Sequence, residues 1–373
     1  GFLRAPGKHH QGGSLDLHTG TGLAALEAAG LKDGFDKLAR YEGAVFTVQD
    51  AQGGNTFTTS PGEGDEERPE IDRGQLRDLL LGSLPPSRVR WGKTLSAVEP
   101  GASGGWVLRF ADGSAETGFR LVVGADGASS AVRPVITSAK PTYSGKTYIE
   151  GRFSHSNPQY AAALEMVGPG NSAAIGAGRV LVVQQMSDRT YRMYAGIEEP
   201  DTSRTRAGGD LDFTTEVEKP RAVLLSLFAD WAPHLRAFIE HAEGPWRVWP
   251  LYSFTADAFE GSAWTRAPGV TLLGDAAHVA LPNGEGVNAA MLDALRLFEC
   301  LTAELGKQGE AFDAEADAAA IEHAVAAYET EMLKRASEHV DDGIMMNDMM
   351  YQADGAERMV AMFKQFAEGA GQS

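Results

Sequence analysis

The first part of the chain alternates turn-rich segments with two stretches that carry a helical pattern. One stretch covers residues 23–29 and the other covers residues 73–84. In the second stretch three leucines fall on one face of a helix, and Asp72 stands where an N-cap residue belongs. Short helices separated by turns are typical of α/β structure.

The region that follows has the apolar runs of β-strands. Residues 106–110 and 119–123 are joined through the turn dipeptide Asp112-Gly113, which predicts a hairpin that leads into a buried strand. Further strand patterns cover residues 179–185 and 190–197. Few helical patterns lie among them, so we expect a mainly antiparallel sheet.

Beyond this region the pattern returns to mixed helix and strand. Helices are predicted at residues 213–229 and 233–241, and a strand is predicted at residues 246–254. A short apolar run at residues 270–273 precedes a tight loop and a helical pattern over residues 286–305. The order strand, loop, helix is that of an α/β unit.

The C-terminal part is predicted to be a long helical tail. Residues 313–350 are rich in Ala, Glu and Met and contain no proline, and only Gly343 suggests a break. Four methionines gather near its end, and we expect them to fill a core. They are Met345, Met346, Met349 and Met350.

These patterns divide the chain into four parts and place it in the α/β class. Residues 1–143 are the first part of an α/β domain, and residues 257–312 are its second part. Residues 144–256 form a β-rich domain between them, and residues 313–373 form the helical tail. The α/β domain should contain a parallel sheet that is covered by helices.

The composition limits the function classes. The chain has 373 residues with 33 Lys and Arg against 51 Asp and Glu, a formal charge of −18, which argues against a nucleic-acid partner. No window approaches 18 uninterrupted apolar residues, so we expect no membrane span. Cys300 is the only cysteine, which excludes an intramolecular disulfide framework and a metal site built from several thiolates. A lone thiol fits a reducing compartment, and the expected location is cytoplasmic.

Two strand ends carry the candidate chemistry. The apolar run 270–273 ends in Gly274-Asp275-Ala276-Ala277-His278, and a glycine-opened helix follows. A carboxylate at a strand end accepts hydrogen bonds, and the backbone amides at a neighbouring helix N-terminus donate them. Polar cofactors bind where such groups lie close together. The run 121–123 likewise ends in Gly124-Ala125-Asp126-Gly127. The alternative is that the small residues only allow close packing and that Asp275 is an N-cap.

In order and spacing, these two segments resemble the aromatic-hydroxylase group of FAD-dependent monooxygenases. Within that group the chain is most similar to the tetracycline-inactivating monooxygenases, and the similarity covers nearly all of the sequence. The shared stretches are Gly12-Gly13-Ser14-Leu15-Asp16-Leu17-His18, Pro69-Glu70-Ile71-Asp72-Arg73 with Leu76 and Arg77, and the helical tail. The resemblance implies a glutathione-reductase-like FAD-binding domain and a β-rich domain that covers the substrate.

The resemblance also implies an activity. Members of the family use NADPH to reduce FAD and hydroxylate an aromatic or polyketide-like small molecule through a flavin hydroperoxide. This reaction requires a cofactor that stores two electrons and activates O2, because no side chain does either well. The reaction needs no side-chain nucleophile, and the sequence has no Gly-x-Ser-x-Gly motif. We therefore assign no catalytic residue and no metal.

The resemblance further assigns contacts to FAD and substrate. Asp275, which follows Gly274, would hold the ribityl chain, and Asp16 and Arg73 would lie near the flavin. Asp126 and Gly127 would serve FAD and NADPH on one nucleotide-binding sheet. The loop beside the isoalloxazine ring would be formed by Pro282, Gly284, Gly286, Val287 and Asn288. Glu150 and Tyr194 fall where family members contact substrate.

One neighbouring residue is assigned a structural role. His278 could be imagined as a proton donor beside the flavin, but we expect it to anchor the loop through hydrogen bonds to backbone.

Two departures from the family pattern matter. The family opens with a strand, a Gly-x-Gly-x-x-Gly turn and a helix, followed by an acidic residue that binds the adenosine ribose, and this βαβ segment is missing from the sequence. Gly20-Thr21-Gly22-Leu23-Ala24-Ala25 imitates the fingerprint, but no buried strand precedes it, so we interpret it as a turn. The loop at residues 282–284 is one residue shorter than in close relatives.

A parallel sheet without its central strands would expose edges that invite association. Three explanations stay open. The sequence is a fragment or a truncated inactive homologue; self-association or a partner chain completes the sheet; or the protein is a flavin-free binding or non-redox relative that lost the nucleotide-binding segment.

Overall fold

One seven-stranded sheet dominates the β-rich half of the molecule. The computed structural model describes residues 2–3, 13–59, 68–102, 104–261, 263–307 and 313–370. The strands of this sheet are β3 (Phe46–Asp50), β4 (Phe57–Thr59), β11 (Thr142–Phe153), β12 (Asn171–Gly176), β13 (Arg179–Gln185), β14 (Tyr191–Glu198) and β15 (Glu243–Ser253). Their order is β15-β11-β14-β13-β12-β3-β4, and only β3 and β12 run parallel.

The middle region is β-rich and mainly antiparallel, as predicted. Two of its strands, β3 and β4, come from residues 46–59 in the N-terminal part. Helix α4 (Tyr160–Val167) was not predicted, whereas α6 (Pro233–His241) has the predicted bounds. Helix α5 (Glu218–Leu227) begins later than the predicted residue 213. The reason is a local turn, because the Asp212 carboxylate accepts hydrogen bonds from the backbone and hydroxyl of Thr214 and competes with helix formation.

The parallel sheet of the α/β part consists of two separate pairs in the described residues. Strand β10 (Val122–Gly124) runs parallel to β16 (Val270–Leu272), and β1 (Phe2–Leu3) runs parallel to β6 (Arg90–Trp91). A third pair, β2 (Ser14–Asp16) with β5 (Glu70–Asp72), is antiparallel. The α/β part therefore contains the two acid-tipped strand ends on adjacent strands.

A small antiparallel sheet flanks this part. It is formed by β7 (Leu95–Pro100), β8 (Trp106–Phe110) and β9 (Ala115–Glu116). The predicted hairpin exists, but its second strand is β9, and the prediction of residues 119–123 for that role was wrong. Strand β10 pairs with β16 instead, because its apolar side chains enter the core that β16 shares with the C-terminal helices.

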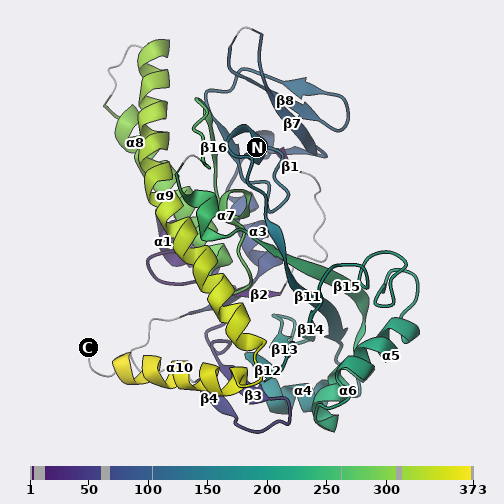
Figure 1. The fold of residues 1–373 in the computed structure, drawn as a ribbon. Coiled ribbons are helices and arrows are strands. Elements are labelled where there is room, and N and C mark those ends of the chain that lie inside the picture. Colours follow the sequence, from purple (N-terminus) through teal and green to yellow (C-terminus); the bar gives the residue numbers. More distant parts are fainter. Residues whose placement is uncertain are drawn as a thin grey trace.

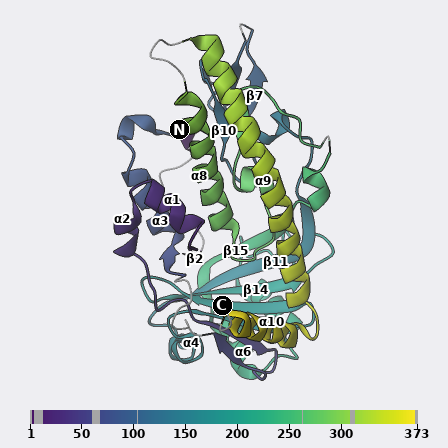
Figure 2. The same ribbon diagram turned by 90° about the vertical axis from the view of Figure 1, so that its left-hand side faces the viewer.

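The helices of the α/β part and the tail complete the fold. They are α1 (Gly22–Ala28), α2 (Lys32–Asp36), α3 (Arg73–Gly82), α7 (Asp275–His278), α8 (Gly286–Leu305), α9 (Ala314–Met350) and α10 (Gly355–Ala370), with short 3-10 turns at Pro86–Arg88, Arg133–Val135 and Ala256–Phe259. Figure 1 shows α9 along one side of the molecule, from the α/β part to the large sheet, and Figure 2 shows α8 beside it. None of the helices in the described residues is long and apolar enough to span a membrane.

Helix α9 is continuous through Gly343, where the sequence suggested a break. A Cβ at this position would lie 2.9 Å from the carbonyl oxygen of Leu281. The glycine therefore allows the loop after α7 to approach the helix closely, and it does not interrupt the helix.

The two faces of the large sheet have different roles. Side chains of β11 such as Ile149 and Phe153 are fully buried against α4, α5 and α6. Their neighbours Tyr148 and Glu150 point to the opposite face, because successive side chains of a strand alternate. That opposite face forms one wall of a cleft toward the α/β part.

Candidate functional site

The two acid-tipped strand ends lie side by side. In the register of β10 and β16, Val122 pairs with Val270 and Gly124 pairs with Leu272. Asp126 and Asp275 follow these strands at the same edge, and both line the cleft. The Asp126 carboxylate accepts a hydrogen bond of 2.7 Å from the backbone of Ala131. Among the residues that the structure describes, none donates a hydrogen bond to the Asp275 carboxylate.

Arg133 joins the loops that follow the two strands. Its guanidinium donates to the carbonyl oxygens of Ala276 at 2.7 Å, Asp275 at 3.0 Å and Gly127 at 3.3 Å. Arg133 is 6% exposed, and its guanidinium lies over the ring of Phe254. Burial lowers the pKa of Arg133, and the nearby carboxylates of Asp126 and Asp275 oppose that shift. The buried guanidinium of Arg133 therefore stabilises the two loops that bring Asp126 and Asp275 together.

The cleft is large enough for more than one ligand. It has a volume of about 2870 Å³, whereas pockets for a single small molecule reach about 1,000 Å³. It extends from the strand ends to the large sheet and the end of α9. The predicted site residues that line it are Asp16, Arg73, Asp126, Gly127, Glu150, Tyr194, Asp275, Pro282 and Gly284.

Four predicted residues are not among those that line the cleft: Gly274, Gly286, Val287 and Asn288. Asn288 is 1% exposed, and its side chain accepts from the backbone of His18 at 2.9 Å and donates to the carbonyl of Asp16 at 3.0 Å. It therefore ties the start of α8 to β2. Val287 packs into the apolar core beneath β2.

A buried carboxylate holds the loop after β16. Asp293 on α8 accepts from the backbone of Gly274 at 3.0 Å, from Nε2 of His278 at 2.6 Å and from Arg335 at 3.1 Å. Burial alone would raise the pKa of Asp293, but these partners lower it. The expectation that His278 bonds to backbone was wrong, because its ring on α7 pairs with the side chain of Asp293 on α8.

A charged triad that sequence reasoning missed lies between β2 and the loop before α8. His18 Nε2 lies 2.8 Å from Asp16 Oδ2, and its Nδ1 lies 3.2 Å from Glu285 Oε2. Burial alone would lower the pKa of His18, but the two carboxylates raise it to about 9. The available signal was the spacing of Asp16, the last residue of β2, and His18, because extended residues two apart point to the same side.

We expect His18 to stabilise the fold in acidic and neutral solution. Its pKa in the folded protein, about 9, lies above the ordinary value of 6.5. The stabilisation is therefore fully present below about pH 6.5 and is lost as the pH rises through about 9. Because Glu285 is 44% exposed, solvent screening limits the contribution to about 1–2 kcal/mol.

Urea unfolding of the wild type and of His18→Gln measures this contribution. The difference in free energy of unfolding should be largest at about pH 6 and close to zero at about pH 9.5. A difference of equal size at both pH values would show that the imidazolium has no part in it.

The sheet wall of the cleft is aromatic around one buried acid. Tyr148, Tyr194 and Trp249 line it, with the rings of Tyr148 and Tyr194 6.1 Å apart. Glu150 is fully buried, and its carboxylate accepts from Trp249 Nε1 at 2.9 Å and from Arg192 at 3.0 Å. Burial, with the charge of Glu150, raises the pKa of Tyr194, so its phenol stays protonated at neutral pH. Glu150 thus holds the wall in place, and Tyr194 presents the polar group.

The far end of the cleft is rich in methionine. The side chains there come from the end of α9, from α10 and from β3 and β4, and they are Met345, Met346, Met350, Met359, Met362, Phe46, Phe57 and Phe363. Of the four clustered methionines, Met350 is buried in a core as expected, whereas Met345 is 62% exposed. Flexible, polarisable thioethers make an adaptable apolar surface.

In the described residues, no group of three or more His, Cys, Asp or Glu side chains could hold a metal ion.

The sequence is similar to a known family of FAD-binding proteins and to several monooxygenases. A family model described as an FAD binding domain matches residues 230–333. Monooxygenase penA of Penicillium thymicola is 30% identical over 326 residues, which span 78% of this chain and 74% of that protein. The 3-amino-4-hydroxybenzoate 2-monooxygenase of Streptomyces cremeus is also 30% identical, over 83% of this chain and 74% of its own length.

Solved structures share the fold at lower identity. HpxO of Klebsiella pneumoniae, complexed with FAD and uric acid, has a TM-score of 0.71 at 21% identity and covers 98% of this chain and 86% of its own. The tetracycline destructase Tet(51) has a TM-score of 0.65 at 16% identity, with 98% and 88% covered. These likenesses show a mixed α/β fold, and they do not single out the tetracycline-inactivating enzymes that the sequence favoured.

Proposed function

Because the chain belongs to the aromatic-hydroxylase family of FAD-dependent monooxygenases, we propose that it hydroxylates an aromatic or polyketide-like small molecule with electrons from NADPH. The observation that carries this proposal is the convergence of Asp126 and Asp275 in a cleft whose opposite wall is aromatic. We also propose that the protein is functionally related to the tetracycline-inactivating enzymes, so that tetracycline is one of the substrates to test.

The residues at the strand ends fit FAD. Asp275 offers a carboxylate that no described residue occupies, so it can accept hydrogen bonds from the ribityl hydroxyls. Gly127 and Gly284 line the cleft with φ values of 82° and 88°, and a Cβ at either would meet no atom within 4 Å. Backbone without side chains leaves room for a ligand to approach closely. Bound FAD would supply the electron storage and O2 activation that side chains lack.

Other cleft residues would orient the two partners. We assign Asp16 and Arg73 to the flavin side and Asp126 to the nucleotide side. The side chains of Tyr148, Tyr194 and Trp249 would hold the substrate ring by stacking, which favours offset or edge contacts. The hydroxyl of Tyr194 would donate to a substrate oxygen, because its raised pKa keeps it protonated. The methionine-rich end would accept the part of a polycyclic substrate that extends away from the reacting carbon.

The test is reconstitution with FAD, followed by NADPH oxidation in the presence of defined probes. We expect the protein to become yellow and to retain FAD on a desalting column. Salicylate, 3-amino-4-hydroxybenzoate, uric acid and tetracycline are suitable probes, and at least one aromatic probe should increase the rate of NADPH consumption and yield a hydroxylated product. Protein that stays colourless after incubation with FAD would favour the flavin-free alternative.

A further inference from the structure

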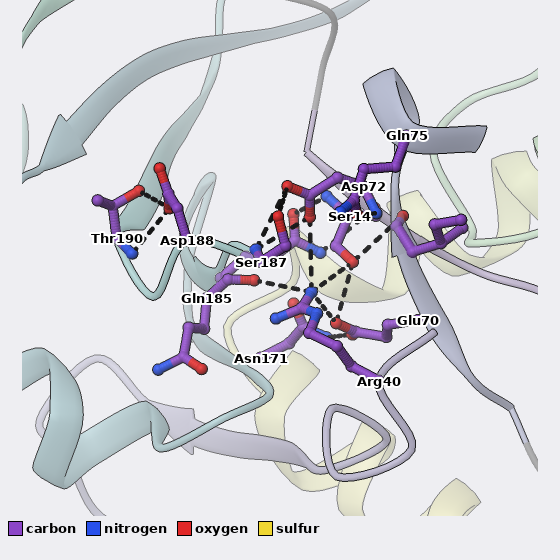
Figure 3. Close-up of polar contacts among 12 residues, drawn as sticks. Ser14, Arg40, Glu70, Asp72, Gln75, Asn171, Gln185, Ser187, Asp188 and Thr190 are labelled. Atoms are coloured by element: carbon purple, nitrogen blue, oxygen red, sulfur yellow. Dashed lines mark hydrogen bonds and ion pairs between the residues drawn. The ribbon is translucent and has the colours of Figure 1, made fainter. Parts of the chain in front are cut away.

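The junction between the α/β part and the large sheet contains a group of polar side chains beside the candidate flavin site. We call Ser14, Arg40, Glu70, Asp72, Asn171 and Ser187 the junction cluster (Figure 3). Arg40 lies at its centre and donates through Nη2 to Ser14 Oγ at 2.8 Å, to Glu70 at 2.9 Å and to the carbonyl of Gln185 at 3.3 Å. One guanidinium thus connects β2, β5 and the end of β13.

Strand β5 supplies two carboxylates that reach the large sheet. Glu70 is 3% exposed and accepts a hydrogen bond of 2.6 Å from Asn171, the first residue of β12. Burial raises the pKa of Glu70 to about 7, although Arg40 and Asn171 oppose the shift. Asp72 accepts from the backbone of Ser187 at 3.1 Å and from its hydroxyl at 2.5 Å. Both carboxylates therefore bridge segments more than 100 residues apart in sequence.

Asp72 has a second role at the start of α3. It is the N-cap of this helix and forms a capping box with Gln75. The next residue, Arg73, opens the helix and lines the cleft on the side assigned to the flavin. The position of the Arg73 backbone therefore depends on the residue that also binds Ser187.

Ser187 lies in a turn that has hydrogen bonds of its own besides those to Asp72. The backbone of Met186 donates to the carbonyl of Thr190 at 2.8 Å, and Asp188 accepts from the backbone of Thr190 at 3.0 Å. This turn joins β13 to β14, and β14 carries Tyr194 on the cleft wall. A contact at the turn is thus transmitted through regular strands to the residue assigned to the substrate.

We propose that Asp72 is a positioning residue, which through Ser187 fixes the flavin-side Arg73 relative to the substrate wall that carries Tyr194. The inference rests on the proposed function and extends it, because Asp72 and Ser187 touch neither ligand site. The two walls must face each other accurately, since a displacement of about 1 Å can cost about 100-fold in rate.

Three variants separate this role from helix capping. Asp72→Ser keeps a residue that caps helices as well as Asp does, but its side chain is too short to reach Ser187. Asp72→Asn keeps both the cap and the reach, and it should rescue most of the effect. Ser187→Ala removes the hydroxyl from the other partner. Ser83→Ala is the matched control, because Ser83 donates to Leu80 at the opposite end of α3 and lies outside the junction cluster.

The first measurement needs no cofactor. In hydrogen exchange of the protein without FAD, Asp72→Ser and Ser187→Ala should increase exchange in the first turn of α3 by about 2- to 10-fold, the effect of one hydrogen bond. Asp72→Asn and Ser83→Ala should leave that turn close to wild type. Wild-type protection of α3 in both Asp72→Ser and Ser187→Ala would overturn the proposal.

The second measurement is FAD affinity by fluorescence quenching. We expect Ser187→Ala, although it lies in the β-rich part, to weaken FAD binding by about 2- to 10-fold, and Ser83→Ala to leave it unchanged. Equal affinity of wild type and Ser187→Ala would overturn the proposal. If the wild type itself binds no FAD, the proposed function fails, and the hydrogen-exchange result still decides whether Asp72 couples the two parts.

Discussion

Replacing Asp275 by Ala is expected to abolish retention of FAD while leaving the fold intact. The carboxylate lies exposed at the end of β16, and no described residue donates to it. Its removal therefore costs the protein no internal hydrogen bond. Hydrogen bonds from ribityl hydroxyls to a charged acceptor contribute about 1.5–3 kcal/mol each, so the Kd for FAD should rise about 10- to 150-fold.

Fluorescence titration with FAD and a thermal melt of the protein without FAD measure the two halves of this prediction. Asp275→Asn keeps the shape and one acceptor, and it should fall between wild type and Asp275→Ala. Glu260→Ala is the control, because Glu260 is an exposed acid outside the cleft. Unchanged FAD affinity in Asp275→Ala would remove Asp275 from the cofactor site. A large fall in Tm would mean that the carboxylate is structural.

The strand-end acids could be predicted from the sequence because their signal is local. In both cases a short apolar run ends in small residues and an aspartate, and the strands are buried enough to be recognised. Helices α8 and α9 were predicted nearly to the residue for the same reason, since each has a long apolar pattern without proline. Elements of this kind can be predicted without knowing which other segments they pack against.

The contacts around the site could not be predicted, because their partners are distant in sequence. His18 meets Glu285 only after α8 folds against β2, and Glu70 meets Asn171 only when β12 joins the large sheet. Strand β3 joins a sheet formed mostly by residues 142–253 by pairing with β12, more than 100 residues away, and that pairing has no local signal. The burial of a carboxylate such as Glu70 also cannot be predicted from sequence, because acidic side chains are usually exposed.

Asp293 gives the largest effect that we expect on stability. Its buried carboxylate joins the backbone of Gly274, the ring of His278 and the guanidinium of Arg335. In Asp293→Ala these three donors lose their acceptor, and removing one partner of a buried charged pair costs about 3–5 kcal/mol. For a chain of 373 residues we expect Tm to fall by roughly 4–6 °C. FAD affinity should fall as well, because Gly274 directly precedes Asp275 on the loop that loses its anchor.

The comparison with an exposed acid on the same helix decides whether burial is the cause. Glu299 pairs with Arg296 one turn away on α8, and both side chains are nearly half exposed. Glu299→Ala removes the same charge, but water replaces the partner, so its cost should stay below about 1 kcal/mol. Asp293→Asn should lie between the two alanine variants, because its amide oxygen can still accept from Gly274. If Asp293→Ala and Glu299→Ala have the same Tm, the buried carboxylate does not hold the loop.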